Sequence, residues 1–452
     1  MAAGVARALL LLASSAVGSA CAVADSEAQE VKLYEGRDAS ADSAGLGVYT
    51  APGGRRLRLG NAVGSSLFRA PGDPAGRFWA LGDRGPSVGC DDAEDILEVD
   101  GKDLCDDPDL GRLFLRPGYA PTIFTITLDD AAAAAGTFSV TGAIPLKRPD
   151  GRPATGLPNP LTRAVVEVPL DGEGRRLAPD PGGIDPEALV RLADGSFWIG
   201  EEYAPSLLQV APDGTILRRL VPEGMEGDLA GAGYPVLGTL PAVLARRQPN
   251  RGIEGLALGE GGRFLYAAMQ SPLANPDADA FKRAANLRLL KVDVATGRPV
   301  AEFVYTLEPM AGFDGEERKA QSVARVSELV HLGGDERFLV VDRTDKTTHL
   351  VLISLAGATD ILGSAWDDPA TSPSLEETAL RPAATGARAG AAVRPATKTL
   401  VFDTADQPEL PGKIEGVALD GDGTLVMVND DDFELEGERT TVIRVEGLEL
   451  GR

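Results

Sequence analysis

Four glutamates recur in one sequence pattern and could together bind a cation. Each is followed by alternating apolar residues, a turn rich in Gly and Asp, and an apolar strand that begins ten residues after the glutamate: Glu187, Glu254, Glu328 and Glu415. Carboxylates held close together raise one another's pKa unless a cation neutralises them, and an oxygen-rich ring suits Ca²⁺ or Mg²⁺ better than zinc. The pattern therefore predicts a calcium site. The alternative is that each glutamate accepts backbone N–H groups and fixes a structural junction.

Charged residues follow the second strand of these repeats at one register, which places them on one face. We interpret five of them as candidate catalytic residues: Asp83, Arg84, Glu202, Asp342 and Arg343. Arginine can hold a phosphate or carboxylate with two hydrogen bonds beside metal-binding acids. The candidate substrate-binding cations are therefore Arg84, Arg251, Arg343 and Lys413, and Asp430 is a fifth candidate metal ligand. The alternative is that these charges only cap strands that end in solvent.

The repeat that carries these residues predicts the fold. After the second strand, each copy continues with a further strand, a turn and a fourth strand, and the Asp-Gly and Gly-containing gaps are hairpin signals. Repeated units of four antiparallel strands are typical of a β-propeller. A fifth, degenerate copy runs from Ser66 to Leu81. We predict an all-β fold, a single β-propeller over residues 25–452, with six blades favoured and five or seven open. Gly47–Leu59 or Leu400–Phe402 would complete a blade or close the ring.

The composition restricts the partners of the protein. The 452 residues include 44 Lys plus Arg and 68 Asp plus Glu, for a formal net charge of −24. This excess of acid argues against binding to nucleic acid or to anionic lipid, because both need a basic face. Beyond the N-terminus, no stretch is long and apolar enough to be a membrane helix. We expect a monomer without a transmembrane span that acts on a small molecule.

The first residues are typical of an export signal. Arg7 is the only charge before Asp25, Ala8–Ala16 is a short apolar run, and Ala22–Ala24 offers small residues for cleavage. We therefore predict a signal peptide over residues 1–24 and a periplasmic or secreted protein. The alternative is lipid anchoring through Cys21, because the sequence from Gly18 to Cys21 is similar to a bacterial lipobox.

Two cysteines remain after removal of the signal segment. Cys90 and Cys105 lie in one short polar loop. In an oxidising compartment such a pair can form a disulfide across the loop. The alternative is two free thiols at the surface.

Several standard catalytic motifs are missing from the sequence. It contains neither G-x-S-x-G, HExxH nor a P-loop, and it has only two histidines, His331 and His349. His331 lies inside a predicted strand and is expected to be packed, whereas His349 is expected to be solvated in a hairpin turn. Neither context supports a Ser-His-Asp triad.

A set of short motifs gives the chain a resemblance to a known family. These motifs are Ala80-Leu-Gly-Asp83-Arg84-Gly-Pro86, Gly183-Ile-Asp185-Pro-Glu187-Ala, Trp198-Ile-Gly-Glu201-Glu202-Tyr203, Asn250-Arg251-Gly-Ile-Glu254-Gly-Leu, Lys413-Ile-Glu415-Gly-Val and Val428-Asn429-Asp430-Asp431-Asp432-Phe433. Together they resemble the bacterial phytase-like family, which is described as having esterase-like activity and groups with the β-propellers. The resemblance implies an exported hydrolase of phosphate or other esters, with calcium by analogy to β-propeller phytases.

These observations favour a metal-assisted esterase or phosphatase, most simply of phosphomonoesters. An acidic protein needs a bridging cation to bind a polyanion, which supports the calcium prediction. Two alternatives stay open: a non-catalytic cell-envelope binding propeller, and a metal-dependent lactonase-like hydrolase.

Overall fold

The computed structural model describes residues 29–36, 45–130, 136–334, 336–380 and 393–451. The predicted signal segment 1–24 and Cys21 lie outside these residues. The described strands group into five four-stranded blades. Blade 1 contains β4 (Ser66–Phe68), β5 (Arg77–Leu81), β8 (Thr122–Asp129) and β9 (Gly136–Pro145), and blade 2 contains β11 (Pro186–Arg191), β12 (Phe197–Glu201), β13 (Ser206–Val210) and β14 (Ile216–Pro222). Blade 3 contains β16 (Ile253–Leu258), β17 (Phe264–Met269), β18 (Asn286–Asp293) and β19 (Arg298–Thr306). Blade 4 contains β20 (Arg325–His331), β21 (Arg337–Arg343), β22 (Thr348–Ser354) and β23 (Thr397–Asp403), and blade 5 contains β24 (Ile414–Leu419), β25 (Leu425–Asn429), β26 (Thr441–Glu446) and β1 (Glu30–Gly36).

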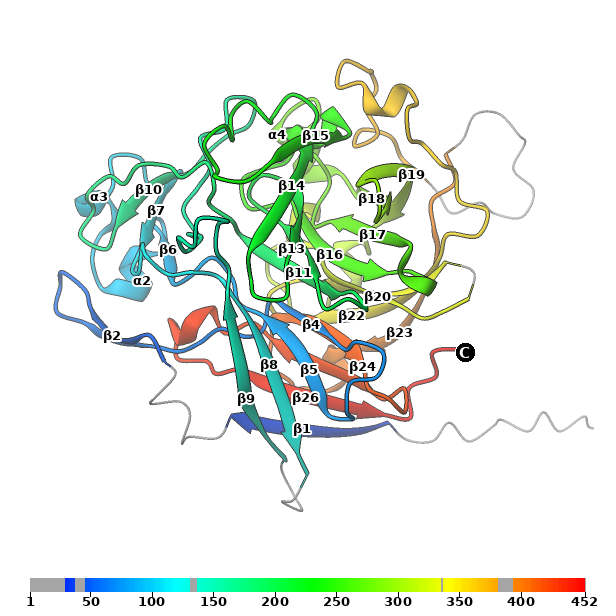
Figure 1. Cartoon of the computed structure of the whole chain (residues 1–452), viewed down its shortest axis with the longest axis horizontal. Helices are drawn as coiled ribbons and strands as arrows, with labels where there is room; N and C mark the ends of the chain where they lie inside the picture. Colours follow the sequence, from blue (N-terminus) through cyan, green and yellow to red (C-terminus); the bar gives the residue numbers. More distant parts are fainter. Residues whose placement is uncertain (1–28, 37–44, 131–135, 335, 381–392, 452) are drawn as a thin grey trace, which may run out of the picture.

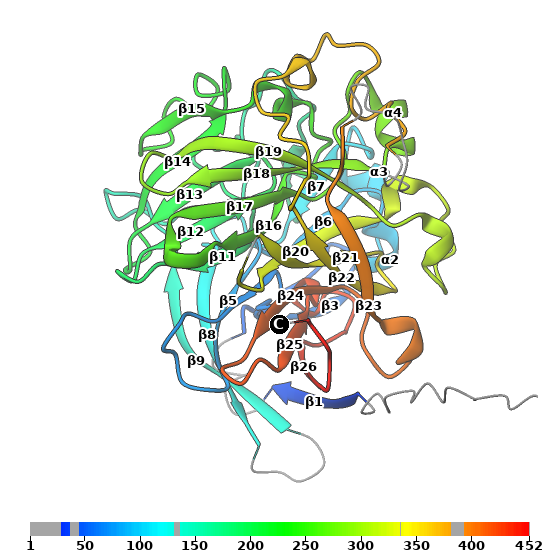
Figure 2. The ribbon, with the colours of Figure 1, turned by 90° about the vertical axis from the view of Figure 1, so that its right-hand side faces the viewer.

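The inner strands close a ring. β4 contacts β11, β11 contacts β16, β16 contacts β20, β20 contacts β24, and β24 returns to β4. A separate apolar cluster fills each of the five interfaces between neighbouring blades. Figure 2 shows the sheets of blades 2 and 3 side by side. The all-β propeller prediction is confirmed. The favoured count of six blades is not confirmed, because the described strands close the ring after five; the degenerate copy at Ser66 forms blade 1.

The N-terminal strand joins the two ends of the chain. β1 pairs antiparallel with β26 and parallel with β9, so it completes blade 5 and links it to blade 1 (Figure 1). Of the two segments expected to complete a blade or close the ring, Leu400–Phe402 completes a blade, whereas Gly47–Leu59 does neither. Gly47–Leu59 forms a separate hairpin of β2 (Gly47–Thr50) and β3 (Arg56–Leu59), and Leu400–Phe402 lies within β23, the outer strand of blade 4.

The remaining elements lie outside these four-stranded blades, although β15 (Val236–Leu240) pairs in parallel with β14 and extends the sheet of blade 2. They are β6 (Ser87–Gly89), β7 (Gly111–Phe114), β10 (Val168–Asp171), β15, α2 (Ala93–Leu97), α3 (Gly101–Leu104), α4 (Ala278–Arg283) and the 3-10 turns η1 (Ala242–Arg246), η2 (Glu260–Gly262), η3 (Met310–Gly312), η4 (Gln321–Val323), η5 (Ala365–Asp367), η6 (Thr404–Asp406) and η7 (Asp432–Glu434). β6, β7 and β10 form a small sheet near α2 and α3. There the predicted Cys90–Cys105 disulfide is confirmed. Within the described residues, no helix has the length and apolarity to cross a membrane.

A β-bulge near the start of four inner strands gives them a common shape. In each, one residue is skipped in the pairing with the next strand: Glu187, Glu254, Ser327 and Glu415. A bulge leaves its extra residue unpaired and re-aims the side chain. The bulges therefore present three glutamates and one serine at the same end of the ring.

Glu328 is one residue beyond the bulge and has a different role. Its carboxylate accepts hydrogen bonds from Ser66 Oγ at 2.6 Å and from the backbone N–H of Leu329 at 3.1 Å, with longer contacts to the N–H groups of Leu67 and Leu256. The donors belong to blades 1, 3 and 4. Glu328 therefore ties three blades together on the axis of the ring, as the structural alternative predicted.

Replacing Glu328 should loosen this junction. In Glu328→Gln, an NH₂ group replaces one acceptor oxygen and faces N–H donors, so the free energy of unfolding should fall by about 1–3 kcal/mol. Urea unfolding, followed by circular dichroism with and without calcium, measures the change. An equal loss in both conditions is expected. A loss confined to the calcium-loaded protein would contradict the junction role.

Candidate cation and anion site

Three of the predicted glutamates converge at one end of the ring axis. Glu187, Glu254 and Glu415 come from the bulges of blades 2, 3 and 5, and each offers a carboxylate oxygen within 4.8 Å of the others. All three side chains are buried. The Oε2 atom of Glu254 is buried without a hydrogen-bond partner. A set of carboxylate oxygens with an unpartnered buried member fits a hard divalent cation such as Ca²⁺.

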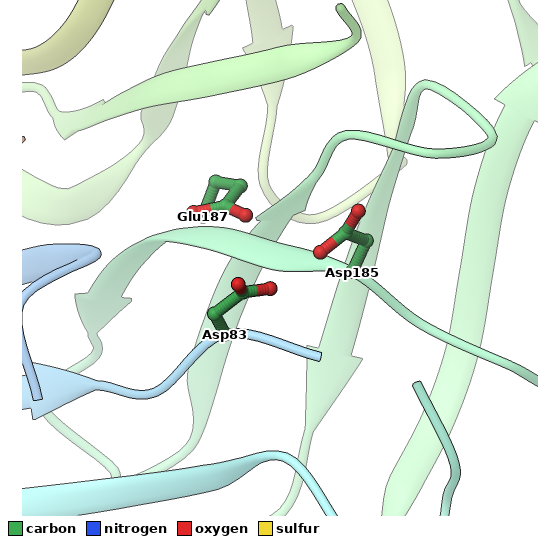
Figure 3. A group of neighbouring side chains, drawn as sticks. All are labelled: Asp83, Asp185 and Glu187. Atoms are coloured by element: carbon green, nitrogen blue, oxygen red, sulfur yellow. The ribbon is translucent and has the colours of Figure 1, made fainter. Parts of the chain in front are cut away.

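A second group of carboxylates shares Glu187. Asp83, Asp185 and Glu187 also hold oxygens within 4.8 Å of one another, and Figure 3 shows the three side chains pointing toward a common space. Asp83 follows β5 of blade 1, while Asp185 directly precedes β11 of blade 2. Asp185 was not among the predicted site residues. Its spacing of two from Glu187 is the signal that could have found it, because such residues share one face of an extended chain.

Burial and mutual repulsion make this cluster electrostatically unfavourable. Burial, followed by the neighbouring carboxylates, raises the pKa of Glu187. Burial and then the charge of Glu415 raise the pKa of Glu254 to about 8. Asp185 has its pKa raised to about 6, mainly by burial, although Arg84 opposes the shift. A bound cation would reverse these shifts, because it stabilises the ionised form.

Two further predicted residues border the cluster. Glu202 follows β12 and accepts a hydrogen bond at 2.5 Å from Nε2 of Gln270. Its pKa is raised by burial and then by Glu254. Asp430 follows β25 and forms an ion pair of 3.0 Å with Lys413. Lys413 also contacts Asp432, so this cation is already neutralised by acids of blade 5.

Two guanidinium groups of blade 4 lie beside the carboxylates of Glu254 and Glu415. Arg343 binds Glu415 and donates through Nε to Ser327 Oγ at 2.5 Å. Arg325, which the sequence analysis did not identify, pairs with the half-exposed Asp345. Burial lowers the pKa of Arg325, and the charge of Arg343 adds to the effect. Positive charge thus accumulates beside the carboxylates.

Arg251 is the cation best placed to accept an anion. Its guanidinium donates to the carbonyl oxygen of Asn250 at 2.9 Å, and no carboxylate among the described residues lies within ion-pair distance. Burial is the main cause that lowers its pKa, and the charges of Glu202 and Glu254 oppose this shift. Arg251 therefore lies between the acidic cluster and the other arginines with its charge only partly compensated.

Arg84 links Asp185 to Glu167 and Asn250. It is buried and donates to Glu167 at 2.8 Å and to Oδ1 of Asn250 at 2.6 Å, while its Nε lies 3.3 Å from Oδ2 of Asp185. Its donors are therefore engaged by the protein. The contacts fit a positioning residue for Asp185 better than a residue that binds substrate.

Asp342 lies outside the site. Its Oδ2 accepts from the hydroxyl of Tyr305 at 2.9 Å and from the backbone N–H of Glu308 at 2.8 Å. The expectation that His349 is solvated is wrong. This histidine is 2% exposed and stacks on Phe313 with ring centroids 4.1 Å apart, because the 310–324 segment covers it. His331 stacks on Tyr266, as expected of a packed histidine.

The structure does not bring Glu328 into the acidic cluster. Blade 4 places Ser327 at the bulge, where the other blades have Glu187, Glu254 and Glu415, and Glu328 occupies the position of Gly255 and Gly416. The glutamate of blade 4 is shifted by one residue, and a shift of one turns a strand residue to the other face.

A cavity of about 940 Å³ lies at the opposite end of the axis. It is lined mainly by the later residues of the inner strands, among them Leu256, Leu329 and Val417, and by no member of the acidic cluster. The two ends of the ring therefore differ in chemistry, one largely aliphatic and the other charged.

Fold and site together define a five-bladed propeller with a carboxylate cluster at one end of its axis. The chain belongs to the phytase-like family, described as "esterase-like activity of phytase", whose model matches residues 116–433. An uncharacterized secreted protein of Arthroderma benhamiae is 26% identical over 229 residues, which cover 44% of each chain. The match thus spans less than half of that relative.

Solved structures give only distant likenesses. The calcium-binding protein regucalcin of Agrobacterium tumefaciens is 12% identical over 86% of this chain and 95% of its own, with a TM-score of 0.30. Streptogramin B lyase is 10% identical over 92% of this chain and 98% of its own, with a TM-score of 0.28. At these scores the likenesses carry no argument about the site.

The buried Asp342 should make stability depend on pH. Burial raises its pKa to about 7, against about 3.9 in an unfolded chain, so its neutral form favours the folded state. That contribution is complete below about pH 4 and is lost as the pH rises to about 7, by at most about 1.4 kcal/mol per pH unit.

The variant Asp342→Asn tests this assignment. Asn keeps an acceptor for Tyr305 and Glu308 and cannot ionise, so urea unfolding between pH 4 and 8 should show a shallower fall in stability than the wild type. The variant should be more stable than the wild type at pH 8. Parallel curves for the two proteins would contradict the account.

Proposed function

We propose that the protein is an exported, calcium-assisted hydrolase of phosphomonoesters. The family supports ester hydrolysis, and the name of the fungal relative supports export. On this proposal, residues 1–24 are removed as a signal peptide and residues 25–452 remain as one propeller domain. The observation that carries the proposal is the partly compensated Arg251 beside the carboxylates of Glu202 and Glu254.

Glu187, Glu254 and Glu415 would hold the cation. Their oxygens form a hard donor set, and the unpartnered Oε2 of Glu254 marks a position that a cation would fill. When bound, calcium would supply charge neutralisation and Lewis acidity toward the ester group. A protein with a formal charge of −24 needs such local positive charge to accept an anionic substrate.

The other residues of the site would bind the substrate, accept a proton and position the ligands. Arg251 and Arg325 would bind the phosphoryl oxygens, and Arg343 would hold Glu415 in place. Glu202 lies outside both carboxylate groups and would accept a proton from the attacking water. The water oxygen would then bond to phosphorus while the bond from phosphorus to the ester oxygen breaks; the leaving alkoxide would take a proton from solvent, and Glu202 would release its proton to solvent. Arg84 would position Asp185.

Turnover of chromogenic esters tests the proposal. The chelated protein should hydrolyse a nitrophenyl phosphate only after calcium is added, and it should prefer this substrate to a carboxylic ester or a lactone. Arg251→Ala should lower kcat/KM about 10–100-fold, because a hydrogen bond to a charged group is lost. Glu202→Gln should lower kcat about 100–10,000-fold.

The exposed Arg298 provides a matched control. Arg298→Ala removes an exposed guanidinium at the start of β19, the outer strand of blade 3, and should leave the kinetics unchanged. No turnover of any ester, with or without calcium, would overturn the enzyme proposal and favour a binding propeller. Preference for a lactone would overturn the substrate class.

A further inference from the structure

We propose that the site binds two calcium ions that share Glu187, the second of them held by Asp83, Asp185 and Glu187. This inference rests on the proposed function for the first ion, and it adds a second site on a different pair of blades. The two carboxylate groups have only Glu187 in common. A carboxylate that joins two cations about 3.5–4 Å apart is the usual arrangement of two-metal hydrolytic sites.

Each group contains a buried carboxylate without the hydrogen bonds that such a group requires. Asp185 is only 1% exposed, yet neither of its oxygens accepts a hydrogen bond; Oδ2 has only the ion pair with Nε of Arg84 at 3.3 Å, and Oδ1 has no partner among the described residues. Oε2 of Glu254, in the other group, also lacks a partner, and Glu254 is 2% exposed. Buried polar atoms are nearly always satisfied, so an unpartnered oxygen in each group points to one ligand for each.

The backbone around Asp185 fixes its carboxylate in this position. The N–H of Asp185 donates to Oε1 of Glu201 at 3.1 Å, and its carbonyl oxygen accepts from the N–H of Glu202 at 2.9 Å. Glu201 is held in turn by the buried Arg219 at 2.5 Å. Asp185 is therefore anchored by its backbone from both sides, next to the start of β11, and a ligand held in this way is fixed with precision.

One divalent ion is too little charge for this cluster. An ion among Glu187, Glu254 and Glu415 would leave Asp83 and Asp185 facing each other across the space shown in Figure 3. The nearest guanidinium, Arg84, contacts Asp185 at 3.3 Å but is bound more closely by Glu167. A second cation would neutralise the pair. The competing explanation is a proton shared between Asp83 and Asp185.

Counting bound ions separates these explanations. Isothermal titration of the chelated full-length protein with calcium, at 150 mM KCl, should give two ions per chain. Asp185→Asn and Asp83→Asn should each reduce the count to one, and Glu254→Gln should also leave one. Glu187→Gln should weaken both sites by tenfold or more. Asp279→Asn, which changes an exposed carboxylate of α4, is the control and should still bind two.

The outcomes distinguish this inference from the proposed function. One ion in the wild type, lost in Glu254→Gln and retained in Asp185→Asn, would overturn the second site and leave the first. Two ions in both Asp185→Asn and Asp83→Asn would overturn the assignment of ligands. No bound calcium would overturn the proposed function as well. Asp83 and Asp185 belong to different blades. If one of the two variants fails to fold, the calcium count of the other still tests the second site.

Discussion

The crowding of buried carboxylates at one end of the axis is the constraint on which the rest of the structure depends. Glu187, Glu254 and Glu415 lie together in a buried environment that disfavours their charge. The ring tolerates them because the surrounding blades supply rigid support. Arg343 binds Glu415, Arg84 braces Asp185, and five apolar interfaces keep the inner strands from moving apart. Such stored electrostatic strain is characteristic of a site that is completed by a ligand.

In the inner strands, the position of a glutamate decides its role. A glutamate at the bulge faces the site, whereas a glutamate one residue later serves as a structural junction. The bulge residue of an inner strand points to the charged end, whereas the next residue lies deeper on the axis, where Glu328 bonds to three blades. The same repeat can therefore provide both a junction and a ligand. This close packing explains why glycine occupies positions 255 and 416. A Cβ at either position would lie 3.3 Å or less from atoms of the neighbouring inner strand.

Local repetition made the fold and half of the site predictable. The ten-residue spacing identified Glu187, Glu254 and Glu415, and alternating apolar residues identified the blades. The repeats were aligned on their glutamates, and this placed Glu328 one residue out of register. The correct alignment follows the apolar residue two positions after each bulge: Leu189, Leu256, Leu329 and Val417. The ion pair of Arg325 with Asp345 and the burial of His349 by Phe313 could not be predicted, because each joins a strand residue to a loop residue, and the loops have no common pattern. The closure of blade 5 by β1 likewise depends on a pairing between the two ends of the chain.

The central claim is that the carboxylates at this end of the ring bind a cation. Anomalous diffraction from crystals grown with terbium in place of calcium tests it directly, because the ion reports its own position. The account predicts strong anomalous density within about 2.3–2.6 Å of the carboxylate oxygens of Glu187. Density confined to surface carboxylates, with Glu187, Glu254 and Glu415 joined only by hydrogen bonds, would contradict it.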